Sequence, residues 1–142
     1  MGVWLGHRIA DAIEHARHAD YAASAELLCQ LQRGERLTAE PLFRAAYHHA
    51  VREWWDQVSI QIDEEHLDAV HAVRRMRVRA RHYLTAEPGA ARPGTLIEHA
   101  LAHTARAAAR HFLAVTAQIL TEQRQADDET VRNDQQQPEQ TG

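Results

Sequence analysis

Apolar residues recur every three or four positions along most of this chain, which is the spacing of an amphipathic α-helix. The first such stripe predicts a helix over about residues 4–33, with Gly34 as its C-terminal stop. A second stripe follows Thr38, whose hydroxyl can cap a helix, and continues to Val58. The first part of the chain therefore predicts two long helices joined by a short linker.

The segment 58–62 alternates apolar and polar residues like a strand, but the sequence offers no second segment of this kind to pair with it. We interpret it as a helix end or a kink, so the second and third helices are either separate or one kinked rod. If they are separate, Asp63 caps the third helix, with Glu64 and Glu65 in its first turn. His66 then lies on the inward face of this helix.

A loop over residues 85–94 precedes the strongest helix start in the chain. Thr95 and Glu98 have the spacing of a capping box. The apolar stripe that follows is narrow and rich in small residues, and consists of Ile97, Leu101, Thr104 or Ala105, Ala108, Phe112, Val115 and Ile119. Such a stripe suits close antiparallel packing inside a bundle or against a second copy of the chain.

Composition supports an all-α fold of one domain. The 142 residues include only six Gly and four Pro, too few for the turns of an all-β fold. Apolar residues make up 44% of the chain, but 26 of them are Ala, so the core is thin. We predict a four-helix, mostly up-and-down antiparallel bundle over residues 1–125. A disordered acidic and Gln-rich tail over residues 126–142 follows it.

The sequence predicts a cytoplasmic protein that does not enter a membrane. No apolar run approaches the roughly 20 residues that span a bilayer, and no basic segment precedes the first apolar residues as in a signal peptide. The single cysteine, Cys29, excludes an internal disulfide and a Cys-based zinc site. Its position in a helical pattern predicts a buried thiol.

Eleven histidines raise the question of a metal site. His99 and His103 are four residues apart, and so are His49 and Glu53, a spacing that places two ligands on one helix face. However, a helical wheel places His99 and His103 opposite the apolar stripe, whereas ligands of a metal in a bundle core point inward. We therefore predict no metal and no cofactor, and a His-rich metal-binding bundle is the third of our functional hypotheses.

Catalysis has little support in the sequence. There is no glycine-rich phosphate loop, and no spacing brings Ser24 or Ser59 to a histidine that could act as its base. We predict that the protein is not an enzyme.

The densest charge feature is a run of five arginines within eight residues: Arg74, Arg75, Arg77, Arg79 and Arg81. Guanidinium groups bind phosphates in a bidentate manner, so these residues are candidates for binding nucleic acid or another anion. The run wraps around its helix instead of forming one stripe, and acidic neighbours could neutralise it as a solvated face. An isoelectric point near 6.2 also counts against a dedicated nucleic-acid binder.

Two adjacent tryptophans point about 100° apart on the second helix. Trp54 fits the apolar face and Trp55 does not. Together with Val51, Trp55 is a candidate anchor for a protein interface, although the first helix could cover it instead.

These observations predict a small, non-enzymatic helical interaction module that self-associates, docks a partner protein, or both. The partner is expected to be a second copy of the chain or another protein, and nucleic acid is possible. The alternative function is a nucleic-acid-associated regulatory protein that uses the arginine run on phosphates.

Overall fold

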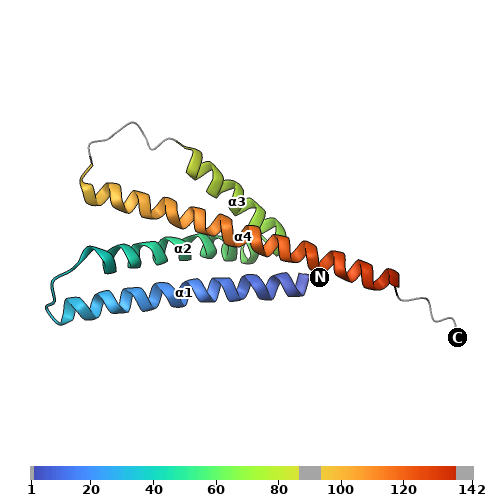
Figure 1. Cartoon of the computed structure of the whole chain (residues 1–142), viewed down its shortest axis with the longest axis horizontal. Helices are drawn as coiled ribbons and strands as arrows, with labels where there is room; N and C mark the ends of the chain where they lie inside the picture. Colours follow the sequence, from blue (N-terminus) through green and yellow to red (C-terminus); the bar gives the residue numbers. More distant parts are fainter. Residues whose placement is uncertain (1, 87–93, 137–142) are drawn as a thin grey trace.

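The computed structural model describes residues 2–86 and 94–136, and Figure 1 shows their arrangement. These residues form four helices and no strand: α1 (Gly2–Gln32), α2 (Ala39–Asp63), α3 (Ala69–Thr85) and α4 (Leu96–Gln136). Successive helices run in opposite directions along the long axis of the molecule (Figure 1). The predicted all-α, up-and-down four-helix bundle is thus confirmed. None of the described helices is long and apolar enough to cross a membrane.

The helices differ strongly in length, and this difference shapes the surface. At a rise of about 1.5 Å per residue, the 41 residues of α4 extend about 62 Å and the 17 residues of α3 about 26 Å. Arg106 of α4 donates a hydrogen bond to the backbone carbonyl of Leu84 at 2.7 Å, which places the end of α3 beside Arg106. The first turns of α4 therefore extend beyond the end of α3. At its other end, α4 projects past the N-terminus of α1 (Figure 1).

The predicted boundary between bundle and tail at residue 126 is wrong, because residues 126–136 continue α4. An established helix extends at little cost per residue, and Gln, Glu and Arg are good helix formers. Gln123 also donates a hydrogen bond at 3.1 Å to Asp127, one turn later. Residues 137–142 of the predicted tail lie outside the described residues.

The connection between α2 and α3 differs from the prediction. Residues 58–62 are helical, α2 ends at Asp63, and α3 begins at Ala69, so the two helices are separate. The cap of α3 is Asp68 instead of Asp63: its carboxylate accepts a hydrogen bond from the backbone N–H of His71 at 2.9 Å. His66 lies in the linker, exposed and with a backbone φ of 56°, so its predicted inward position is also wrong.

Helix starts and stops elsewhere follow the sequence signals. Thr95 Oγ1 accepts a hydrogen bond from the backbone N–H of Glu98 at 3.2 Å, which is one of the two hydrogen bonds of a capping box. Gly34 follows α1 with a φ of 70°, in the left-handed region that favours glycine. Thr38 directly precedes α2, but its side chain makes no capping hydrogen bond.

All four helices contribute to one core. Its largest fully buried side chains are Phe112, Leu5, Ile9, Met76, Ile119, Val58 and Val73. Trp55 also belongs to it, with 2% of its surface exposed, and contacts Phe112 edge-on at 5.0 Å between ring centres. Trp54 is half-buried and stacks on Phe112 at 5.6 Å. Phe112 thus packs against both tryptophan rings.

Of the two alternatives for Trp55, an interface anchor together with Val51 or a residue covered by a neighbouring helix, the structure shows the second, because both residues are buried. Helix α2 packs against both α1 and α4, so it buries a wider arc than the single stripe drawn on its wheel. Cys29 was expected to be buried and is exposed.

Candidate functional site

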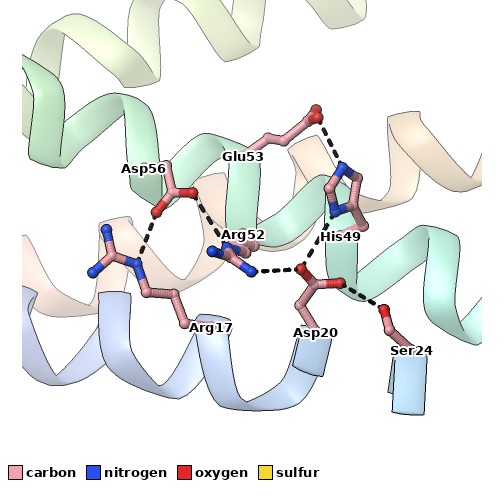
Figure 2. A network of polar contacts seen from close by, with 7 residues as sticks. All are labelled: Arg17, Asp20, Ser24, His49, Arg52, Glu53 and Asp56. Carbon is pink, nitrogen blue, oxygen red and sulfur yellow. Dashed lines mark hydrogen bonds and ion pairs between the residues drawn. The ribbon is translucent and has the colours of Figure 1, made fainter. Parts of the chain in front are cut away.

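A polar network joins α1 to α2 (Figure 2). Its centre is Asp20 of α1, which is only 4% exposed. The Asp20 carboxylate accepts hydrogen bonds from Arg52 at 3.0 Å and from Ser24 at 3.4 Å, and lies 3.3 Å from His49 Nδ1. Asp56 of α2 extends the network, since it accepts hydrogen bonds from Arg52 at 3.3 Å and from Arg17 at 3.0 Å.

The network keeps the buried Asp20 charged. Burial by itself would raise the pKa of Asp20, but the hydrogen bonds and positive charges of Arg52 and His49 more than offset this effect and lower the pKa. Conversely, the hydrogen bond to Asp20 raises the pKa of Arg52. These groups are already paired within the protein, and we infer that the network orients α1 against α2.

Sequence reasoning missed Asp20, although a signal was present. Asp20 interrupts the apolar stripe of α1 between Ala16 and Ala23, where a carboxylate requires a partner on another element. The partner itself could not be read from the sequence because Arg52 is 32 positions away.

The histidine pairs lie as the helical wheel indicates. His99 and His103 are both exposed. His49 Nε2 contacts Glu53 at 3.1 Å, so the expected spacing forms an ion pair when His49 is protonated. Within residues 2–86 and 94–136, no group of three or more His, Cys, Asp or Glu side chains could hold a metal ion.

A pocket of about 510 Å³ lies between α1, α2 and α4. His15, His48 and His111 are among its lining residues, together with Val51 and Trp55 of the core. Burial, followed by the charges of His48 and His15, lowers the pKa of His111. The pocket thus favours a neutral imidazole at His111.

The stripe of α4 that the sequence predicted to face inward is only partly covered. Ala108, Phe112 and Ile119 are buried, but Ile97 is 58% exposed and Leu101 is 36% exposed. Helix α3 ends beside Arg106, so Ile97 and Leu101 lie in the first turns of α4, beyond the end of α3.

A groove of about 660 Å³ continues this exposed stripe. Ala105, one turn after Leu101, lines it together with Trp54 and Tyr83, whose rings meet edge-on at 6.2 Å. Tyr83 is itself exposed. We call the surface formed by Trp54, Tyr83, Ile97, Leu101 and Ala105 the uncovered seam.

The arginine run divides among different surroundings. Arg75 pairs with Glu65 and donates a hydrogen bond to Gln61 at 2.9 Å. This arginine is therefore neutralised by an acidic neighbour, which was the alternative to anion binding. Arg79 is exposed and lies 3.8 Å from the Met76 sulfur. The other three arginines of the run, Arg74, Arg77 and Arg81, line a groove between α3 and α4.

Comparison of the chain with protein-family models, with curated proteins and with solved structures gave no match. The function of the chain is therefore to be sought on its own surfaces. Of these surfaces, the uncovered seam exposes apolar side chains in the first turns of α4, beyond the end of α3.

Proposed function

We propose that this protein is a non-enzymatic helical interaction module of the cytoplasm that self-associates through the uncovered seam. The observation that carries the proposal is the exposure of Ile97 and Leu101 on the same stripe of α4 that is buried further along. Apolar side chains at helical spacing, next to an aromatic groove, form a surface that a second helix can cover.

A second copy of the chain is the occupant that the seam suits best. The exposed apolar residues of α4 need an apolar partner, and α4 of a second copy offers the same stripe in return. A twofold axis beside Leu101 would pair the two α4 helices in antiparallel orientation, each covering the other's Ile97. The same surface on both copies would then be buried in one step.

The size of the seam predicts a weak dimer. Ile97 and Leu101 together expose about the equivalent of one complete side chain per copy. Burial of one such side chain from each of two copies contributes on the order of 3–6 kcal/mol, to which Tyr83 and Trp54 add. Because association itself costs at least about 4 kcal/mol, only a few kcal/mol of net binding free energy remain, and we expect a dissociation constant in the millimolar range.

Sedimentation measured over a series of concentrations that reaches the millimolar range tests the proposal. The wild-type mass should rise from the 16.1 kDa of one chain towards twice that value. The Ile97→Glu/Leu101→Glu variant should remain at the mass of one chain, because each substitution places a charge on the surface that must be desolvated.

Val131→Glu provides the matched control, since Val131 is another exposed apolar residue of α4 but lies far from the seam. This variant should associate like the wild type. A wild-type mass that stays at 16.1 kDa throughout would overturn the proposal, and so would an equal loss of association in both variants.

A further inference from the structure

A second surface, separate from the uncovered seam, lies in the groove between α3 and α4. The groove has a volume of about 400 Å³. Helix α3 contributes Arg74, Arg77 and Arg81 to its lining, and α4 contributes Arg124. The other lining residues are Val78, Ala117, Leu120 and Thr121, so none of the described residues that line the groove is acidic.

The arrangement follows from helical spacing. Residues 74, 77 and 81 are separated by three and four positions and therefore lie on one face of α3. They extend over about 10 Å of the helix axis. Arg124 comes from the facing helix and adds a fourth guanidinium group.

Arg77 is the half-buried arginine of the groove. Its guanidinium group donates hydrogen bonds to the backbone carbonyl of Leu113 at 2.6 Å and to the hydroxyl oxygen of Thr116. Burial, and then the nearby charge of Arg81, lowers the pKa of Arg77. Arg77 is thus held in place by uncharged acceptors, and its positive charge is not neutralised by them.

The arginines of the described residues fall into two groups, those that pair with a carboxylate and those that do not. Arg8, Arg17, Arg33, Arg44, Arg52 and Arg75 each pair with a carboxylate. Within the described part of the chain, Arg74, Arg81 and Arg124 form no ion pair with a carboxylate. The same is true there of Arg36, Arg79, Arg106, Arg110 and Arg132, but among the described residues only the groove brings four arginines together along one lining. The chain has 20 acidic and 16 basic residues, so this local excess of positive charge does not follow from composition.

We propose that the arginine groove, defined by Arg74, Arg77, Arg81 and Arg124, binds a ligand that carries linked phosphate groups. Guanidinium groups bind phosphate oxygens through paired, charge-assisted hydrogen bonds. The arginines extend over about 10 Å of the helix axis, a length greater than the roughly 3.4 Å rise per phosphate of one strand in a duplex, so the groove can contact more than one phosphate of the same ligand. A single-stranded nucleic acid and a free polyphosphate present the same chemistry, and experiment separates them.

Fluorescence anisotropy with a labelled single-stranded oligothymidylate tests the proposal, at salt concentrations of roughly 50 and 200 mM. Inorganic tripolyphosphate and inorganic monophosphate serve as unlabelled competitors. Binding should weaken with salt, and tripolyphosphate should compete well below the concentration at which monophosphate does.

The test variant is Arg74→Gln/Arg81→Gln, which removes two exposed arginines from the groove. Its affinity should fall by about tenfold or more, and its log–log salt slope should be shallower by about 1.4, since each phosphate contact on a single strand contributes about 0.7. The control is Arg36→Gln/Arg79→Gln, which removes the same charge at exposed positions outside the groove and should change affinity little. Circular dichroism confirms that both variants are folded.

The two sources of phosphate give different results, and either one supports the proposal. Binding of the oligonucleotide assigns the groove to a nucleic-acid strand. Binding of tripolyphosphate alone, measured by calorimetry, assigns it to a smaller polyphosphate. Three results would overturn the proposal: no binding of either ligand at low salt, equal loss in the two variants, or equal competition by monophosphate. None of these results depends on self-association through the uncovered seam.

Discussion

Replacement of Asp20 by Asn removes the charge at the centre of the α1–α2 network while the shape of the side chain is kept. The Asn carbonyl can still accept a hydrogen bond from Arg52, which lies 3.0 Å from the native carboxylate. What is lost is the charge-assisted character of that bond and of the contact with His49. The expected result is a lower free energy of unfolding and an unchanged fold.

The magnitude follows from the burial of the partners. A hydrogen bond to a charged group contributes about 1.5–3 kcal/mol, and Asp20 is 4% exposed, so water cannot replace it. Arg52 and His49 are more accessible and regain part of their solvation in the variant. We therefore expect Asp20→Asn to reduce the free energy of unfolding by about 1–2 kcal/mol at neutral pH.

The pH dependence provides a second check. Because the folded-state pKa of Asp20 is lowered from its ordinary value of 3.8, its stabilisation is fully present above that value. It is lost as the pH falls through the folded-state pKa. The difference between wild type and variant should therefore disappear in strong acid, where a protonated Asp resembles Asn.

Urea unfolding followed by circular dichroism measures these differences, and Asp56→Asn is the matched control. Asp56 also accepts a hydrogen bond from Arg52, but its side chain is 32% exposed, so its loss should cost less than about 1 kcal/mol. An equal cost for the two substitutions, or a difference that persists in strong acid, would refute the reasoning.

Three further predictions concern the core, the histidine pocket and a helix end. Trp55→Ala should reduce the free energy of unfolding by about 3–5 kcal/mol in urea titrations, and Trp54→Ala by clearly less, because Trp54 is only half-buried. Since the pKa of His111 is lowered in the folded state, the stability of the wild type should decline as the pH falls below the ordinary value of 6.5. Thermal unfolding between about pH 5 and pH 8 should show a shallower decline for His111→Gln. Gly34→Ala should cost about 1–2 kcal/mol in thermal unfolding, because a φ of 70° strains any residue with a Cβ.

The sequence predicted the four helices and their order because each carries its own periodic stripe. Local signals also located several helix ends, as at Gly34 and Thr95. The start of α3 was misplaced because Asp63 and Asp68 are both suitable caps. Only packing decides between them: α2 continues to Asp63 and buries Val58 and Gln61 on the way.

The candidate site was harder to predict because it depends on which helix covers which. The stripe of α4 indicates that Ile97 and Leu101 are apolar, but not that α3 ends before reaching them. The wheel of α2 placed Trp55 outside the stripe, and a second neighbouring helix buries it. The arginine groove could not be predicted either, because its fourth arginine, Arg124, lies 43 positions beyond Arg81 and comes from another helix.

The most direct test of self-association through the uncovered seam is the distance between copies at its rim. A spin label at Glu98→Cys, in a chain with Cys29→Ser, reports on an exposed position beside Ile97. A label at Arg132→Cys, about 50 Å further along α4, is the control. We predict magnetic coupling between copies at position 98, lost on dilution with unlabelled protein, and none at position 132. A dimer that shows coupling at position 132 and none at position 98 would contradict this account.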